Sequence, residues 1–203
     1  MKILIATANA HKVDEIREIL AGFPLELCDL RDFPPVEPPE ETGRDYAENA
    51  LLKAVFYSKH TGLPALSDDS GLEVDALDGA PGLYSARFGG HDMPHSQKIL
   101  RVLELLKQHP EKGRTARFRC CSTLVNPQTG QTLSQEATCE GFIAETPSGE
   151  HGFGYDPIFM VDSRRTMAEL SAQEKHAISH RGKSLRGLLG QIYPTTNAPT
   201  ARP

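Results

Sequence analysis

The chain has 203 residues and a formal net charge of −5, with 38% hydrophobic and 24% charged residues. These values suit a globular protein, and no apolar run approaches the about 18 residues that a membrane-spanning helix requires. The negative charge argues against a general nucleic-acid binder, because non-specific binding requires a basic surface.

Compartment and redox state can be predicted from the first residues and the cysteines. The N-terminal apolar stretch is too short for a signal peptide, and the four cysteines show no C-x-x-C spacing. Cys120 and Cys121 would point to opposite faces of a strand, which disfavours a disulfide between them. We therefore expect reduced thiols, no zinc site and a cytoplasmic protein.

The chain begins with a predicted strand–loop–helix unit. Residues 3–6 are a continuous apolar run, typical of a strand buried on both faces, and the apolar spacing over 13–20 predicts a helix. Thr7 or Asn9 could cap this helix. The free N–H groups at its start, with Lys12 one turn further on, could instead bind phosphate oxygens. Both interpretations stay open, because the loop lacks the glycines of known phosphate-binding motifs.

A second short strand is predicted over residues 25–28, followed by a proline-rich loop that carries Glu40 and Glu41. These glutamates are either solvent-exposed surface residues or supply one metal ligand. A helix is then predicted over residues 46–60, capped by Asp45. Lys53, near its middle, taken alone would be an ordinary solvated lysine.

The segment 67–71, Ser-Asp-Asp-Ser-Gly, follows a short apolar run. We expect a buried strand that ends in Asp68, Asp69 and a glycine turn at the sheet edge where α/β proteins bind ligands. Adjacent carboxylates repel each other unless a cation meets them, and Mg²⁺ is a common partner of oxygen ligands. The alternative is a solvated acidic turn, because Asp, Ser and Gly all favour turns.

The middle of the chain is expected to add a helix and a hairpin. The glycines of residues 78–90 predict mobile or tightly turned backbone, and a helix is predicted over 96–108. Residues 115–125 and 131–137 flank a five-residue loop and predict a β-hairpin, which 138–143 would extend. The buried side of the helix is expected to consist of Ile99, Leu100, Leu103 and Leu106.

The C-terminal third contains a glycine loop with aromatic residues at 149–159, which leads into a predicted strand. Ser171 opens a capping-box pattern, and residues 185–192 show the clearest amphipathic helix. Residues 195–203 are predicted to form a disordered tail. No linker divides the rest, so residues 1–194 are predicted to be a single two-lobed domain.

Seven blocks together resemble the inosine triphosphate pyrophosphatase family, the dITP/XTP diphosphatases, in its bacterial form. They occur in order and span residues 3–192, which makes the resemblance specific although each block alone is weak. The blocks are Thr7-x-Asn9-x-x-Lys12, Glu41-Thr42-Gly43, Glu48-Asn49-Ala50-x-x-Lys53-Ala54, Asp68-Asp69-Ser70-Gly71-Leu72, Gly79-Ala80-Pro81-Gly82-x-Tyr84-Ser85-Ala86-Arg87, Gly152-Phe153-Gly154-Tyr155-Asp156-Pro157 and Glu174-Lys175-x-x-Ile178-Ser179-His180-Arg181.

The resemblance implies an α/β fold, with an elongated mixed β-sheet flanked by two helical lobes and the active site in the groove between them. It also implies a homodimer. The implied reaction is the Mg²⁺-dependent hydrolysis of noncanonical purine nucleoside triphosphates (ITP, dITP and XTP) to the monophosphate and pyrophosphate, which removes them from the nucleotide pool.

The resemblance also implies roles for individual residues. Asp69 would be the general base, and Glu41, Asp68 and Asp69 would hold the Mg²⁺ ion, with Glu40 as an alternative to Glu41. On the triphosphate side, the expected substrate-binding residues are Thr7, Ala8, Asn9, Ala10, His11, Lys12, Lys53 and Ser70. At His11, either a phosphate contact or simple exposure is possible.

Further substrate-binding residues would be Phe153, Gly154, Tyr155, Asp156, Lys175, His180 and Arg181, on the side of the base. Asp156 has no role here beyond lining the site, and whether this acceptor favours a 2-amino group stays open. Phe153 can stack on any purine, so it cannot discriminate between bases. The donors Lys175, His180 and Arg181 suit a 6-oxo group, and the 6-amino group of adenine would leave them unpaired. This argument excludes ATP but does not explain how GTP would be rejected.

Three other functions remain as alternatives. A Maf-like pyrophosphatase would act on modified pyrimidine nucleotides, and a nucleotide sensor would bind without turnover. An RNA-binding module is suggested by Arg117 and Arg119, although the net charge and an aromatic content of 6% weigh against it.

Overall fold

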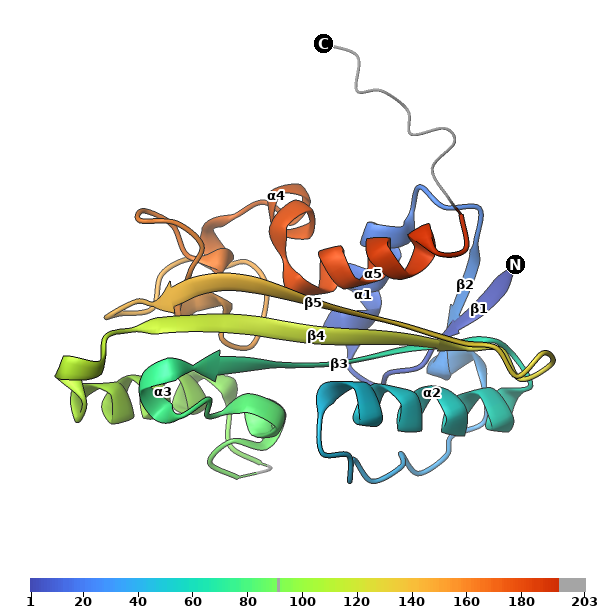
Figure 1. Ribbon diagram of the computed structural model, residues 1–203, viewed down its shortest axis with the longest axis horizontal. Helices are drawn as coiled ribbons and strands as arrows, with labels where there is room; N and C mark the ends of the chain where they lie inside the picture. Colours follow the sequence, from blue (N-terminus) through green and yellow to red (C-terminus); the bar gives the residue numbers. More distant parts are fainter. Residues whose placement is uncertain (91, 194–203) are drawn as a thin grey trace, which may run out of the picture.

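A six-stranded mixed sheet forms the centre of the computed structural model, which describes residues 1–90 and 92–193 (Figure 1). The strand order is β2-β1-β3-β4-β5-β6; β1 is parallel to β2 and β3, and the other neighbours are antiparallel. The strands are β1 (Lys2–Ile5), β2 (Glu26–Asp29), β3 (Ala65–Val74), β4 (Thr115–Val125), β5 (Thr132–Ile143) and β6 (Phe159–Met160).

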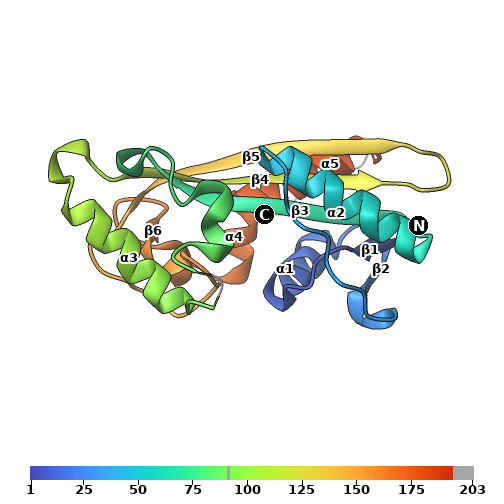
Figure 2. The same cartoon turned by 90° about the horizontal axis from the view of Figure 1, so that it is seen from below.

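Helices cover both faces of this sheet. α2 packs against one face of β3 and β4, and α5 packs against β4 and β5 on the other side (Figure 1). α3 lies toward one end of the long strands, whereas α1, β1 and β2 lie toward the other (Figure 2). The helices are α1 (Ala10–Leu20), α2 (Tyr46–Thr61), α3 (His95–Lys107), α4 (Ala172–Ile178) and α5 (His180–Gly190). The predicted α/β class with a mixed sheet between helical layers is confirmed.

The predicted helix starts are confirmed in detail. The side chain of Asn9 accepts the Lys12 N–H at 3.3 Å, so Asn9 caps α1, while Thr7 Oγ1 accepts the Asn9 N–H at 3.2 Å. Asp45 caps α2, and Ser171 forms a capping box with α4. Each of these caps therefore satisfies at least one of the orphan N–H groups at the start of its helix.

The prediction for the acidic segment was wrong in one respect. β3 does not end at the two carboxylates but runs straight through them to Val74, paired with β4 along its whole length. Asp68 lies opposite Ser122 and Gly71 lies opposite Arg119. Buried cations from other elements bind the carboxylates, and so the chain does not need a solvated turn there.

One face assignment in α3 was also wrong. Leu100 is 54% exposed, because the side of the helix that meets the core follows an i, i+3, i+4, i+7 series from Ile99, in which Val102 takes the place predicted for Leu100. That series consists of Ile99, Val102, Leu103 and Leu106.

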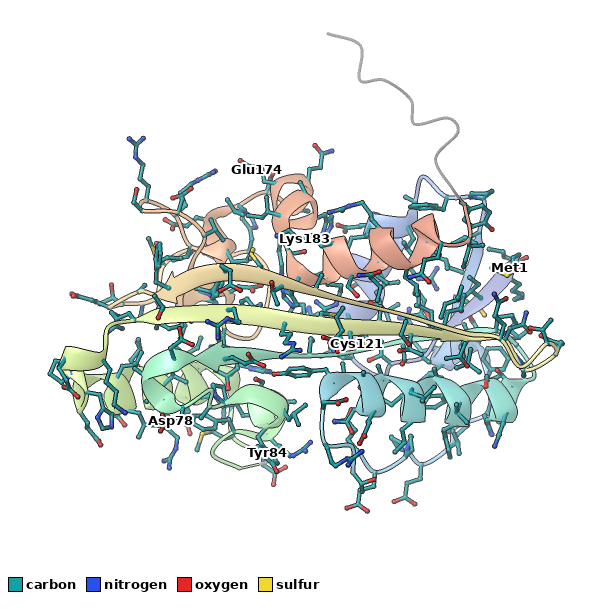
Figure 3. All side chains as sticks on the ribbon, in the orientation of Figure 1. Met1, Asp78, Tyr84, Cys121, Glu174 and Lys183 are labelled. Atoms are coloured by element: carbon teal, nitrogen blue, oxygen red, sulfur yellow. The ribbon has the colours of Figure 1, made fainter. Side chains whose placement is uncertain are left out.

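The hairpin is confirmed, and β5 continues without a break to Ile143. The glycine-rich segment after β3 is tightly turned, with positive φ at Gly79, Gly82, Gly89 and Gly90. All four cysteines are buried and free, and Figure 3 shows Cys121 midway along the sheet. The tail predicted over 195–203 lies outside the described residues. Within the part of the chain that the structure describes, no helix has both the length and the apolar character to cross a membrane.

Candidate active site

A cavity of about 440 Å³ opens where the start of α1, the middle of β3, α2 and the loop before it, and the segments 83–87 and 153–156 meet. Strand β3 supplies Asp69, Ser70, Gly71 and Leu72 to its wall. Successive residues of a strand point to opposite faces, so the neighbouring Asp68 and Asp69 enter different environments.

Asp68 is fully buried among cations. Its Oδ2 accepts hydrogen bonds from Nε and Nη2 of Arg181 at 3.1 and 2.9 Å, and lies 3.1 Å from Lys12 Nζ. Burial alone would raise the pKa of this carboxyl, but Arg181, Lys12 and Lys53 outweigh it and hold the pKa well below its usual range. The second oxygen, Oδ1, has no hydrogen-bond partner among the described residues.

Asp69 faces α2 and the cavity. Its Oδ1 lies 3.1 Å from Lys53 Nζ, and its Oδ2 accepts a hydrogen bond from Asn49 Nδ2 at 3.2 Å. Burial raises the pKa of Asp69 against the opposing effect of Lys53, and the nearby Glu41 raises it further. A carboxylate with a raised pKa is suited to accept a proton.

Glu41 completes a second cluster with the same lysine. Lys53 Nζ lies 2.7 Å from Glu41 Oε1, and Arg87 Nη1 donates to Glu41 Oε2 at 3.4 Å. Glu40, in contrast, is exposed and does not line the cavity. Of the adjacent Glu40 and Glu41, only Glu41 lines the cavity.

Asp156, Lys175 and Arg181 line the cavity and belong to a second network, which is centred on Glu15 of α1 behind the cavity wall. Glu15 Oε1 lies 2.5 Å from Lys175 Nζ, and its Oε2 accepts a hydrogen bond from Arg181 Nη1 at 2.6 Å. Lys175 also donates to Asp156 at 2.6 Å. Burial opposes ionisation of Glu15, but Arg181 and Lys175 lower its pKa, so the three charges stabilise one another.

The aromatic rings of Phe153 and Phe118 also line the cavity. Phe153 lies between Gly152 and Gly154, both with positive φ, and its ring is approached by Lys175 Nζ at 5.0 Å from the centroid. His180 stacks on Phe118 at 4.7 Å, and burial together with Arg181 and Lys175 lowers its pKa well below the usual value. At neutral pH His180 is therefore a neutral imidazole, able to donate from one nitrogen and accept at the other.

The structure brings most of the predicted site residues together around this cavity. Ala10, His11 and Asp68 are the exceptions. Ala10 and His11 line neighbouring pockets, and Asp68 lies behind the wall. Those that line the cavity are Thr7, Ala8, Asn9, Lys12, Glu41, Lys53, Asp69, Ser70, Phe153, Gly154, Tyr155, Asp156, Lys175, His180 and Arg181.

Sequence reasoning missed three residues that contribute to the site. Glu15 could have been found from the need of Lys175 and Arg181 for a counter-charge, but nothing in the chain order connects them. Arg87 is the last residue of the block Gly79–Arg87, for which the sequence analysis gave no role. His95, at the start of α3, lines the cavity and carries no distinctive sequence signal.

The carboxylates do not form a ready metal cluster. Among the residues that the structure describes, no group of three or more His, Cys, Asp or Glu side chains is arranged to hold a metal ion. The reason is visible in the contacts: Lys53 binds Glu41 and Asp69, while Arg181 and Lys12 occupy one oxygen of Asp68.

Fold and site together define an α/β protein with one cavity that is lined by lysine, arginine, carboxylate and aromatic side chains. The chain belongs to the Ham1 family, whose model matches residues 3–191. The family predicted from the sequence is thus confirmed.

Relatives of known name cover almost the whole chain. A dITP/XTP pyrophosphatase of Exiguobacterium sp. is 48% identical over 195 residues, which is 96% of this chain and 98% of the relative. One of Bacillus cereus is 47% identical over 193 residues, 94% of each chain. Among solved structures, the HAM1 protein from Coxiella burnetii matches with a TM-score of 0.86 and 40% identity, covering 96% of this chain and 99% of that one. A nucleoside-triphosphatase / dITP/XTP pyrophosphatase from Mycobacterium abscessus matches with a TM-score of 0.72 and 43% identity, covering 93% and 99%.

Proposed function

We propose that this chain hydrolyses noncanonical purine nucleoside triphosphates, dITP, ITP and XTP, to the monophosphate and pyrophosphate. The enzyme class, a nucleoside triphosphate pyrophosphatase, follows from family membership and from near-full-length relatives of that name. The observation that carries the substrate proposal is a single cavity lined both by cationic groups suited to phosphates and by a stacking ring with hydrogen-bond donors.

The triphosphate would bind to Lys12, Lys53 and Arg87, which line the cavity. The start of α1 also lines it, and the N–H groups left free at a helix N-terminus favour negative charge. The same groups would stabilise the charge that develops on the leaving pyrophosphate as water attacks the α-phosphorus.

Asp69 would be the general base that takes a proton from the attacking water. It lines the cavity, its pKa is raised by burial, and Lys53 and Asn49 fix its orientation. A general base of this kind accelerates a reaction by a factor of roughly 10²–10⁴.

Mg²⁺ would bind by taking the place of Lys53 between Glu41 and Asp69, because with this lysine in place the described side chains form no metal cluster. Glu41 and Asp69 already share one cation, Lys53, and Asp68 keeps one buried oxygen without a hydrogen-bond partner among the described residues. These three carboxylates would hold the ion. When bound, Mg²⁺ would neutralise phosphate charge and keep the carboxylates ionised.

The purine base would be recognised by Lys175, His180 and Arg181, which line the cavity. Lys175 gives two of its three N–H bonds to Glu15 and Asp156, and so one donor remains for a purine oxygen. A 6-oxo group accepts such a donor, whereas the amino group of adenine cannot. Sites that read a substrate by buried donors can reject the wrong group by roughly 10⁴.

The test is pyrophosphate release from dITP, ITP, XTP, dGTP and ATP, each with and without Mg²⁺. The proposal expects Mg²⁺-dependent release from the first three and near-silence from ATP. Equal turnover of all five would refute the 6-oxo argument and leave the hydrolase standing. Turnover of modified pyrimidine nucleotides alone would favour the Maf-like alternative, and binding without turnover would favour a sensor. A homodimer and a cytoplasmic location remain predictions of the family resemblance and of the sequence.

A further inference from the structure

His11 makes a contact that its position in the phosphate-binding turn does not suggest. Its imidazole ring stacks on the ring of Phe153, with centroids 5.4 Å apart and planes inclined by 13°. Phe153 lines the main cavity, but His11 does not; it lines a smaller pocket of about 220 Å³ beside Gly152 and Lys175. His11 is thus an exposed residue, and it lies against the Phe153 ring rather than on the wall of the main cavity.

The Phe153 ring is contacted from outside its own loop by His11 and by two cations, with Lys175 Nζ 5.0 Å and Arg181 Cζ 5.5 Å from its centroid. Its backbone is flanked by Gly152 at φ 74° and Gly154 at φ 66°, conformations that only glycine adopts freely, so the loop itself does little to fix the ring. The backbone N–H of Phe153 is held by Asp156 at 2.9 Å, which anchors the main chain but not the side chain.

We propose that His11 is a positioning residue that holds the Phe153 ring at the angle required for purine stacking. This inference rests on the proposed function and assigns His11 to the base end of the substrate. His11 directly precedes Lys12, whose backbone N–H is capped by Asn9. The ring contact therefore connects the phosphate-binding turn of α1 to the base-binding loop.

This role and a phosphate contact predict different measurements. A stacked aromatic pair is worth about three- to tenfold in an equilibrium constant. If His11 acts through Phe153, His11→Ala should raise the KM for dITP and the Kd for dIMP by about that factor. It should leave kcat within about twofold and leave the inhibition constant of inorganic tripolyphosphate, which has no base, unchanged.

The experiment compares His11→Ala, His11→Phe and His151→Ala in the full-length protein. His11→Phe should restore the wild-type KM, because a second ring can stack where an imidazole did. His151→Ala, in the same loop as Phe153, is the control and should behave as wild type. In a Phe153→Ala background, His11→Ala should have no further effect, since the residue through which it acts is gone.

Two results would overturn the inference. One is a weaker inhibition by tripolyphosphate in His11→Ala without rescue by His11→Phe, which would identify a phosphate contact. The other is a KM for dITP and a Kd for dIMP that do not rise in His11→Ala. Unchanged values would mean that the His11–Phe153 stack does not affect base binding, and lower values would mean that His11 covers the base site. Failure of the proposed function is distinguishable, because it would appear as absent dITP turnover in the wild type, whereas calorimetric binding of dIMP still tests His11.

Discussion

Removal of the Arg181 guanidinium should destabilise the fold far more than removal of an ordinary arginine. Its side chain is 2% exposed and donates to Asp68, Glu15 and Ser70. Arg181→Met would leave the carboxylate of Asp68 fully buried, with Lys12 at 3.1 Å as its cationic partner and the Cys120 thiol at 3.8 Å as a weak donor. Breaking a buried pair costs about 3–5 kcal/mol, a large share of the about 5–15 kcal/mol that stabilises a typical domain.

The matched control is Arg44→Met. Arg44 also pairs with a carboxylate, that of Glu48 at 2.5 Å, but its side chain is 88% exposed, and such pairs contribute about 0–1 kcal/mol. Urea unfolding of both variants, followed by circular dichroism, gives the two losses directly. The double variant Arg181→Met/Asp68→Asn should recover part of the loss, because the uncompensated charge is removed. Equal losses for Arg181→Met and Arg44→Met would refute the argument that the buried network stabilises this fold.

Three further predictions concern stability and reactivity. Gly71→Ala should lower the melting temperature and reduce the free energy of unfolding by about 1–3 kcal/mol or more, because its methyl group would meet the backbone carbonyl oxygen of Gly82. Gly190→Ala is the control: its methyl group enters open space, and the free energy of unfolding should not fall. The free energy of unfolding should fall between pH 7 and pH 5, by up to about 1.4 kcal/mol per pH unit from His180 alone. The reason is that the unfolded imidazole takes up a proton near its ordinary pKa of about 6.5, whereas burial lowers the pKa of the folded one. In urea unfolding at both pH values, the free energy of unfolding should change less with pH in His180→Phe than in the wild type, and an equal change would contradict this. A thiol reagent should label no cysteine of the native protein and all four in urea, since all are buried and burial raises the pKa of Cys120 to about 12; rapid native labelling would contradict it.

Local signals in the sequence predicted most of the fold. Caps such as Asn9 and Asp45, and the alternation along the hairpin, act over a few residues and are read directly from the chain. The acidic segment was different, because turn-forming residues outnumber the others there. Its strand conformation depends on Arg181 and Lys12, which approach from elements that local patterns cannot place beside it.

The candidate site shows the same limit. Lys53 could be named, but its two partners, Glu41 and Asp69, come from separate segments and meet only in the folded chain. Glu15 was missed for this reason: it looks like a solvated residue of an amphipathic helix until Lys175 lies 2.5 Å from it.

The central claim is that water attacks the α-phosphorus of a purine triphosphate with Asp69 as the base. Hydrolysis of dITP in ¹⁸O-labelled water with Mg²⁺, analysed by mass spectrometry beside Asp69→Asn, tests it most directly. We expect equal amounts of dIMP and pyrophosphate with the label in dIMP, and a variant slower by roughly 10²–10⁴. Label in pyrophosphate or inorganic phosphate, or an Asp69→Asn variant as fast as the wild type, would contradict the account.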